Sequence, residues 1–197
     1  MKVLKIIVGI LSVPLVIVLF WYMIIYTSLK NPIDEMLYSE ITRFKIVDLP
    51  RYSEVINSDT SYDLRGDGGF ISLSYNLNNL QFNERVSIYV SNLKTYLFIY
   101  DLSLKNGKSL IITYKYDRTS FLRQNIYLTD GDESKIEDLD IIFEYLSENQ
   151  LDKEWLKNKS EIVLHDILLK PWFEKGSQRY SFENLGNLKI EESTLLK

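Results

Sequence analysis

The stretches ISLSYNL (71–77) and VSIYVS (86–91) decide the fold of this chain. In both, every second residue is large and apolar or aromatic, and the residues between are mostly serine or asparagine. This period of two is typical of antiparallel strands with one buried face. Three further candidate strands follow, at residues 94–102, 109–117 and 121–129. The sequence therefore predicts an antiparallel meander of about five strands, with the Asn-Gly pair at 106–107 suited to a tight hairpin turn.

On the carboxyl side of these strands the apolar period becomes that of a helix. Ser134 and Glu137 have capping-box spacing, and an apolar stripe runs through residues 136–146. Further helices are predicted near residues 152–157 and 161–170, the last ended by Pro171. Two terminal strands are predicted at residues 178–185 and 188–192.

On the amino side, a short amphipathic helix precedes the strands. Asn31 can cap this helix, Pro32 suits its first position, and apolar residues recur at helical spacing as far as Phe44. Short strands are predicted near residues 45–49 and 62–64. The whole pattern predicts an α+β domain, a curved antiparallel β-sheet with about three helices packed on one face.

The N-terminal stretch IIVGILSVPLVIVLFWYMIIY (6–26) contains no charged residue. As a helix it spans about 30 Å, the thickness of the bilayer hydrocarbon core. We therefore predict a single transmembrane helix that contains Ile6 and Pro14, with Trp21 and Tyr26 near the outer interface. The alternative is a cleaved signal peptide, but the apolar region of a signal peptide is shorter and ends at a small-x-small site.

The charges that flank this segment predict its orientation. Lys2, Lys5 and the terminal amine precede it, whereas Lys30, Asp34 and Glu35 follow it, so the positive-inside rule favours a cytoplasmic N-terminus. Residues 1–29 are then a membrane anchor, and residues 30–197 form one extracellular domain of a single-pass protein of the cell membrane. The bias is only a few charges, so a domain that faces the cytoplasm is the alternative topology.

Composition excludes several classes of function. Residues 1–30 hold three lysines and no acid, so the other 20 basic and 27 acidic residues give the remaining chain a net charge of −7. This balance argues against a nucleic-acid partner, which requires a basic surface. The absence of cysteine excludes disulfides, thiolate metal sites and cysteine nucleophiles. His165 is the only histidine and no catalytic motif surrounds it, so we predict no enzymatic activity, no cofactor and no metal site.

Fourteen tyrosines point instead to a surface for protein contacts. Strand alternation is used to divide the side chains between the two faces of the sheet. The residues predicted to face the helices are Val86, Ile88, Val90, Leu97, Ile99, Ile126 and Leu128. The residues predicted to bind a partner on the open face are Tyr89, Tyr96, Phe98, Tyr100, Arg123, Asn125 and Tyr127. The alternative is that several of these aromatic residues cover the core, because a slip of one residue exchanges the two faces of a strand.

Two stretches resemble a known family. The anchor that continues into NPIDEMLYSE (31–40), and the tail RYSFENLGNLKI (179–190), are similar to TipC-family immunity proteins of Gram-positive bacteria. The layout of one membrane span followed by a β-rich domain also agrees with that family. The resemblance identifies no contact residue.

The resemblance implies a non-enzymatic role in protection from a secreted toxin. The toxin would be of the LXG type, delivered by type VII secretion and active on lipid II outside the membrane. A family member would bind this cognate toxin with the concave surface of its sheet, and an acidic domain would suit a basic partner. The alternative function is a cell-envelope sensor or assembly factor that binds a peptide, lipid or wall fragment. An envelope hydrolase is a third hypothesis, which would require a convergent pair of carboxylates in a pocket.

Overall fold

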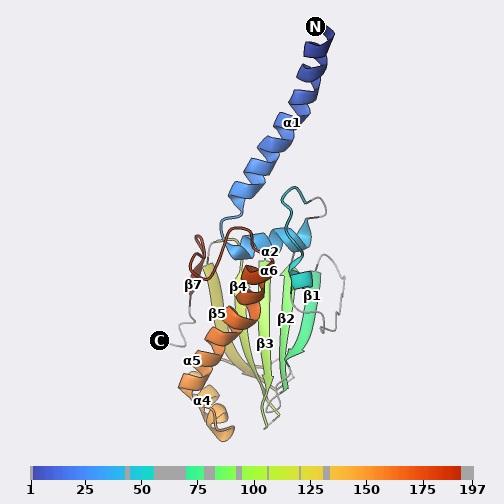
Figure 1. The fold of residues 1–197 in the computed structure, drawn as a ribbon. Helices are drawn as coiled ribbons and strands as arrows, with labels where there is room; N and C mark the ends of the chain where they lie inside the picture. The colour runs from blue at the N-terminus through green and yellow to red at the C-terminus, as the bar shows by residue number, and fades with distance from the viewer. Residues whose placement is uncertain are drawn as a thin grey trace.

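A computed structural model gives the fold of this protein (Figure 1). It describes residues 2–42, 45–55, 70–77, 83–91, 95–105, 107–119, 121–130 and 134–191. The described side chains do not include those of residues 2–11, 70–77, 90, 91 and 95. The predicted strand at 62–64 and the side chain of Ile6 therefore lie outside the described part of the chain.

Five long strands form an antiparallel meander. They are β1 (Phe70–Leu77), β2 (Asn83–Ser91), β3 (Thr95–Ser103), β4 (Ser109–Tyr116) and β5 (Phe121–Thr129). Each strand pairs with the next one along the chain, so the predicted meander is confirmed. In the β3–β4 hairpin Gly107 has φ +81°, a conformation that glycine adopts without strain.

Two short strands complete the sheet, and both pair with β5. The strand β6 (Lys135–Ile136) is antiparallel to it, whereas β7 (Lys189–Glu191) is parallel to it. The predicted strand at 188–192 is thus confirmed. The one predicted at 178–185 is wrong, because that segment contains only an isolated bridge between Ser181 and Asn184.

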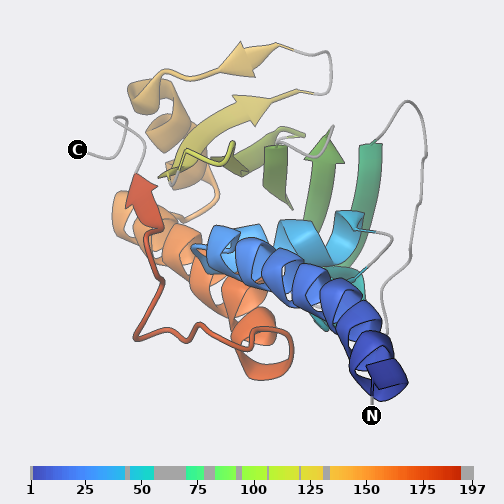
Figure 2. The same cartoon turned by 90° about the horizontal axis from the view of Figure 1, so that it is seen from above.

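The helices of the domain lie on one face of the sheet, as predicted (Figures 1 and 2). They include α2 (Pro32–Ile41), α3 (Tyr52–Val55) and α4 (Leu139–Glu148). A longer helical run follows through α5 (Lys153–Ile162), η1 (Val163–Leu169) and α6 (Lys170–Lys175). The sheet bends through β4 and β5, so the side without these helices is concave (Figure 2). We call the two sides the helix-covered face and the concave face.

The start of α2 agrees with the sequence, and the segment after it does not. The side chain of Asn31 accepts a hydrogen bond from the backbone N–H of Asp34 at 3.0 Å, so the predicted cap is confirmed. Residues 45–49 form no strand. The hydroxyl oxygen of Tyr38 instead accepts the N–H groups of Ile46 and Val47, at 2.8 and 3.2 Å, so a side chain replaces a strand partner.

The predicted start of the next helix is also wrong. Residues 135 and 136 pair with β5, so the helix begins after the proposed capping box. Asp138 caps α4, accepting the N–H groups of Asp140 and Ile141.

Pro171 does not end a helix. The preceding stretch η1 is a π-helix, in which the N–H of Lys170 bonds to the carbonyl of His165. Pro171 is the second residue of α6 and directly follows this change in the hydrogen-bond pattern. The helices predicted at 152–157 and 161–170 are therefore parts of one continuous run.

The core fills the space between the sheet and its helices. Side chains from β2 to β5 that are almost or wholly without exposed surface meet Tyr52 of α3 and Trp172 of α6. Tyr52 contacts Tyr96, Phe98 and Trp172 through tilted or edge-on ring pairs, with centroids 5.8 to 6.3 Å apart.

The N-terminal helix α1 (Lys2–Ser28) extends away from the domain (Figure 1). Its described apolar side chains from Val13 to Ile24 are 40–62% exposed, and Pro14 lies inside the helix. In the described part of the chain, no helix is both long enough and apolar enough to cross a membrane.

Candidate functional site

The concave face is the open surface that the fold presents. Strand pairing aligns Ser87 with Ile99, Ile99 with Thr113, and Thr113 with Asn125 across four strands. Directly paired residues of an antiparallel sheet point to the same side. Since their neighbours Val86, Tyr100, Ile112 and Ile126 are fully buried beneath the helices, these four point to the concave face.

The centre of this face is a shallow floor. Ser87, Thr113 and Ile111 are only 6–7% exposed, although no described helix covers them. The hydroxyl of Thr113 donates to the carbonyl of Asn125 at 3.5 Å. Ile99, which pairs with both Ser87 and Thr113, is half-buried and gives a partner with a convex surface an apolar contact at the centre of this face.

Charged and aromatic side chains surround the floor. Arg85 and Asp101 form an ion pair at 2.7 Å, and Arg123 lies 3.9 Å from Glu191 of β7. Lys135 stands over the ring of Tyr127 at 4.8 Å. Burial raises the pKa of Tyr127, and the nearby carboxylates of Asp101 and Glu137 raise it further, so this phenol stays neutral and available as a hydrogen-bond donor.

The charge of this face differs from that of the whole domain. Basic side chains outnumber acidic ones among the described residues that strand pairing places there. The basic residues are Arg85, Lys115, Arg123, Lys135 and Lys189, and the acidic ones are Asp101 and Glu191. The net acidity of the domain therefore does not come from this face, and an acidic contact surface on a partner is complementary to it.

The structure divides the predicted contact residues between the two faces. Tyr89, Arg123, Asn125 and Tyr127 lie on the concave face, where Arg123 and Asn125 are exposed and the two tyrosines half-buried. Whether these four contact a partner stays a prediction.

The outward orientation predicted for β3 is wrong. Tyr96, Phe98 and Tyr100 have no exposed surface and belong to the core. From Tyr96 to Tyr100 both alternating sets of β3 are apolar or aromatic, so the period within this stretch does not show which set faces the helices. The polar residues at the ends of the strand, Thr95, Asp101 and Ser103, belong to the set of Leu97 and Ile99. Pairing of Ile88 with Phe98 fixes the choice, because Ile88 is itself buried.

Sequence reasoning placed Ile99 toward the helices, which is wrong, and did not name Thr113 and Lys115, although all three lie on the concave face. A signal was present, because a meander fixes the face of each strand from that of its neighbour. Had β2 served as the reference for β3 and β4, these three residues would have been assigned to the concave face.

A second feature joins the end of α1 to the domain, and we call it the anchor junction. Arg179 donates hydrogen bonds to the carbonyls of Tyr26 and Leu29, and its guanidinium lies 4.2 Å from the centroid of the Tyr26 ring. Tyr180 donates to the carbonyl of Leu29 at 2.8 Å. The last carbonyls of a helix lack partners within that helix, and the C-terminal segment supplies them here.

The same segment also contacts the residues just after α1. The N–H of Asn187 donates to the carbonyl of Lys30 at 3.2 Å, and the side chain of Asn31 donates to Asn187. Gly186, at φ +64°, approaches this carbonyl so closely that a Cβ atom would stand 2.3 Å from it. The stretches 31–40 and 179–190, which carry the family resemblance, are thus bound to one another.

A buried carboxylate completes the junction. Glu35 is 1% exposed and accepts hydrogen bonds from Ser177 at 2.5 Å and from the indole of Trp172 at 3.2 Å. Burial raises the pKa of Glu35 above its ordinary value, while these two bonds act in the opposite direction. The group holds α2 against α6 and the C-terminal segment.

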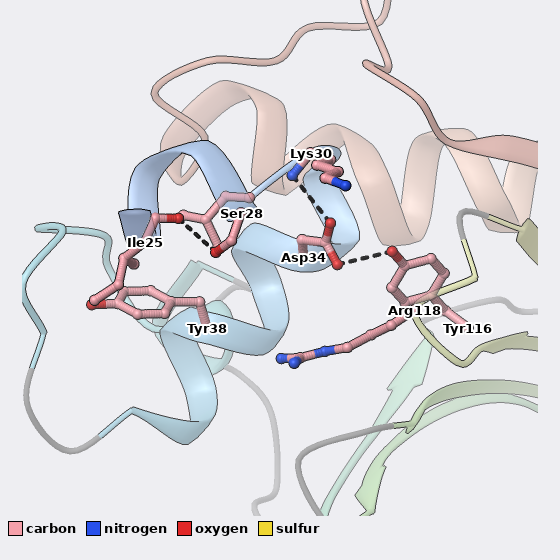
Figure 3. A pocket seen from close by; sticks show the side chains of 8 residues that line it. Ile25, Ser28, Lys30, Asp34, Tyr38, Tyr116 and Arg118 are labelled. Carbon is pink, nitrogen blue, oxygen red and sulfur yellow. Dashed lines mark hydrogen bonds between the residues drawn. The ribbon is translucent and has the colours of Figure 1, made fainter. Parts of the chain in front are cut away.

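A pocket of about 410 Å³ lies at the foot of α1 (Figure 3). Its lining residues are Ile25, Ser28, Leu29, Lys30, Asp34, Tyr38, Tyr116 and Arg118. Asp34 accepts from the hydroxyl of Tyr116 at 2.8 Å and from the N–H of Lys30 at 3.1 Å. Arg118 enters from the β4–β5 hairpin with φ +66°, a conformation that is unfavourable for a residue with a side chain.

His165 and the acidic residues were the other positions considered for catalysis or metal binding. His165 lies half-buried in η1 beside the exposed ring of Phe182. Among the described residues, no three histidine, cysteine or acidic side chains are arranged to hold a metal ion.

Comparison with known proteins agrees with this architecture. A solved structure with a similar fold is that of TipC2 from Streptococcus intermedius B196, with a TM-score of 0.60 and 19% sequence identity. The match covers 83% of this chain and 95% of that one. A comparison with curated protein sequences gives no match. The family model described as TipC immunity protein-like matches residues 5–193. This chain therefore belongs to the TipC immunity protein-like family.

Proposed function

We propose that this chain is a membrane-anchored immunity protein that binds and neutralises a cognate secreted toxin outside the cytoplasmic membrane. The immunity role follows from the family, whose model matches nearly the whole chain. The observation that carries the binding mode is the concave face, an open surface with a shallow floor and a charged rim. By the family resemblance, the toxin is an LXG toxin of type VII secretion that acts on lipid II, and inhibition is by direct contact rather than by catalysis.

The anchor belongs to this proposal. Residues 6–26 carry no charge, and α1 is helical over Lys2–Ser28. An exposed apolar surface of this extent requires a cover, and lipid provides one. Lys2 and Lys5 precede the apolar run, which supports a cytoplasmic N-terminus and an extracellular domain.

Copurification with the toxin encoded beside this gene tests the binding role. We expect Ile99→Arg, in the middle of the concave face, to weaken toxin binding by about 30-fold or more, as at an interface hot spot. The matched control is Ile162→Arg, on the outer surface of α5, where the native side chain is 45% exposed. Equal affinity of the two variants would exclude the concave face as the contact surface.

Truncation tests the anchor separately. A chain that begins at Ile25 keeps Tyr26 and Leu29, which contact Arg179, and should bind the toxin in solution as the full chain does. It should protect sensitive cells poorly, because it is no longer concentrated at the membrane. An unrelated transmembrane helix fused in front of Ile25 should restore protection. Full protection by the untethered chain would contradict a role for the anchor.

A further inference from the structure

We propose that the pocket at the foot of α1 binds the phosphate group of an anionic phospholipid headgroup. The pocket combines two cations, hydroxyl groups and an apolar wall, at the point where the exposed apolar helix meets the polar domain (Figure 3). This inference rests on the proposed membrane anchor, since only an anchored chain holds the pocket at the level of the headgroups.

The two cations are Lys30 and Arg118. Both side chains are exposed, and within the described residues no carboxylate lies within 4 Å of either charged group. They come from distant parts of the chain, Lys30 from just after α1 and Arg118 from the β4–β5 hairpin, and both line the pocket. Lysine and arginine are the residues that proteins use to hold phosphate.

The acid in the pocket offsets only part of this positive charge. Asp34 accepts hydrogen bonds from Asn31, from the N–H of Lys30 and from the hydroxyl of Tyr116. Burial raises the pKa of Asp34, while these bonds and the nearby charges of Arg118 and Lys30 act in the opposite direction. One carboxylate against two cations leaves the pocket with a net positive charge that suits a phosphodiester.

The remaining lining fits the rest of a lipid headgroup. The ring of Tyr38 lines the pocket, and its hydroxyl accepts two backbone N–H groups that fix the position of this side chain. Ile25 and Leu29 supply the apolar wall: Ile25 lies in the last turn of α1, and Leu29 follows the end of this helix where it meets the domain (Figure 1). Tyr22 stacks on Tyr26 at 5.8 Å in the neighbouring turn, as expected for aromatic residues at a membrane interface.

The strained hairpin supports the same assignment. Arg118 adopts a left-handed conformation that glycine or asparagine would adopt more readily. Strain of this kind tends to accompany functional positions, and here it directs a guanidinium toward α2 at the edge of the pocket (Figure 3).

The test uses the full chain reconstituted in nanodiscs of phosphatidylcholine with a minority of phosphatidylglycerol. Native mass spectrometry after release in mild detergent counts the lipids that stay bound. We expect selective retention of phosphatidylglycerol, reduced about fivefold for each cation removed in Lys30→Gln, Arg118→Gln and the double variant.

The matched control is Lys157→Gln with Lys170→Gln, which removes the same charge from two exposed positions on α5 and α6. This control should retain phosphatidylglycerol as the unmodified chain does. Equal retention by the double variant and the unmodified chain would overturn the proposal, as would equal loss in the control, because a general effect of net charge would then explain the result.

Inorganic phosphate distinguishes the source of the ligand. If phosphate displaces the bound lipid, compared with chloride at equal ionic strength, the phosphate group alone is recognised. If it does not, the glycerol or acyl parts contribute, and the headgroup source is supported. If the chain fails to enter the bilayer, the proposed anchor fails. The pocket is then tested by whether phosphate raises the melting temperature of the unmodified chain but not of the double variant, and no such difference overturns it.

Discussion

The two faces of the sheet use the same strands in opposite ways. On the helix-covered face, three tyrosine hydroxyls donate hydrogen bonds inside the protein. Tyr52 donates to the carbonyl of Leu168, Tyr100 to Glu84 and Tyr114 to the carbonyl of Ser160. On the concave face, Tyr89 and Tyr127 are half-buried beside ion pairs at the surface. Many of the tyrosines thus build the core, and a high tyrosine content does not by itself mark a contact surface.

The largest expected effect is a loss of folding stability from a substitution on the helix-covered face. Glu84 is 2% exposed and pairs with Lys159 of α5 at 2.7 Å, while Lys159 also lies over the ring of Tyr100. Lys159→Met would leave a buried carboxylate without its cation, which costs about 3–5 kcal/mol. Urea unfolding should show this loss, whereas toxin affinity of the folded fraction should stay unchanged.

The control for that variant is Lys157→Met, which removes an exposed cation from the same helix. Its free energy of unfolding should change by less than about 0.5 kcal/mol. If Lys159→Met is as stable as this control, the ion pair does not hold α5 on the sheet.

A smaller effect compares one tyrosine from each face. Tyr114 donates to Ser160 and accepts from Gln124, both of which are buried. Tyr114→Phe should destabilise the protein by about 1–3 kcal/mol, since buried polar groups lose their partner. Tyr127→Phe should have almost no effect on stability, because no group in the described chain bonds to its hydroxyl. Thermal unfolding of the two variants tests this difference. Equal melting temperatures would show that the Tyr114 hydroxyl contributes no more to stability than the Tyr127 hydroxyl does.

Much of the fold was predictable because most strands can be recognised from the alternation of residues within the strand. The segment 121–129 alternates cleanly and coincides with β5. Alternation failed in the middle of β3, where Tyr96, Phe98 and Tyr100 interleave with Leu97 and Ile99, and the polar residues of one set stand only at the ends of the strand. In this strand the pairing with β2 and the packing of the helices decide the face.

The anchor junction was not predictable from any local pattern. The bonds from Arg179 to Leu29 and from Asn187 to Lys30 join residues about 150 positions apart, and no periodicity encodes such a partner. The π-helix before Pro171 escaped prediction for a related reason. The sequence rule predicts that a helix ends before proline. Here the hydrogen bonds before Pro171 follow the π-helix pattern, and the helical run continues into α6.

Charge reversal on the concave face and on the outer surface of α5 should change the rate of toxin association differently. Lys115 is exposed on the concave face, and Lys115→Glu should slow association with the toxin by a small factor at low salt. Lys157→Glu changes the net charge equally on the outer surface of α5 and should leave the rate nearly unchanged. Stopped-flow measurements at two ionic strengths separate the cases, since the effect should fade as salt rises. Faster association of Lys115→Glu would show that the toxin presents a basic surface instead.

The smallest expected effect is on the pH dependence of folding stability, through the buried side chain of Glu35. The pKa of Glu35 is raised by burial above its ordinary value of 4.5. The folded state therefore holds this proton more tightly than the unfolded state does. Its contribution to stability is present at low pH and is lost as pH rises through the folded pKa. Glu35→Gln keeps an acceptor for Ser177 and Trp172 but removes the titration, so its stability should fall less between pH 4.5 and neutral pH. The stability of Glu35→Gln should still fall somewhat as pH rises, because the pKa of Asp34 is also raised. Urea midpoints measured across this range test the sign, and parallel curves for the two proteins would show that Glu35 does not titrate within it.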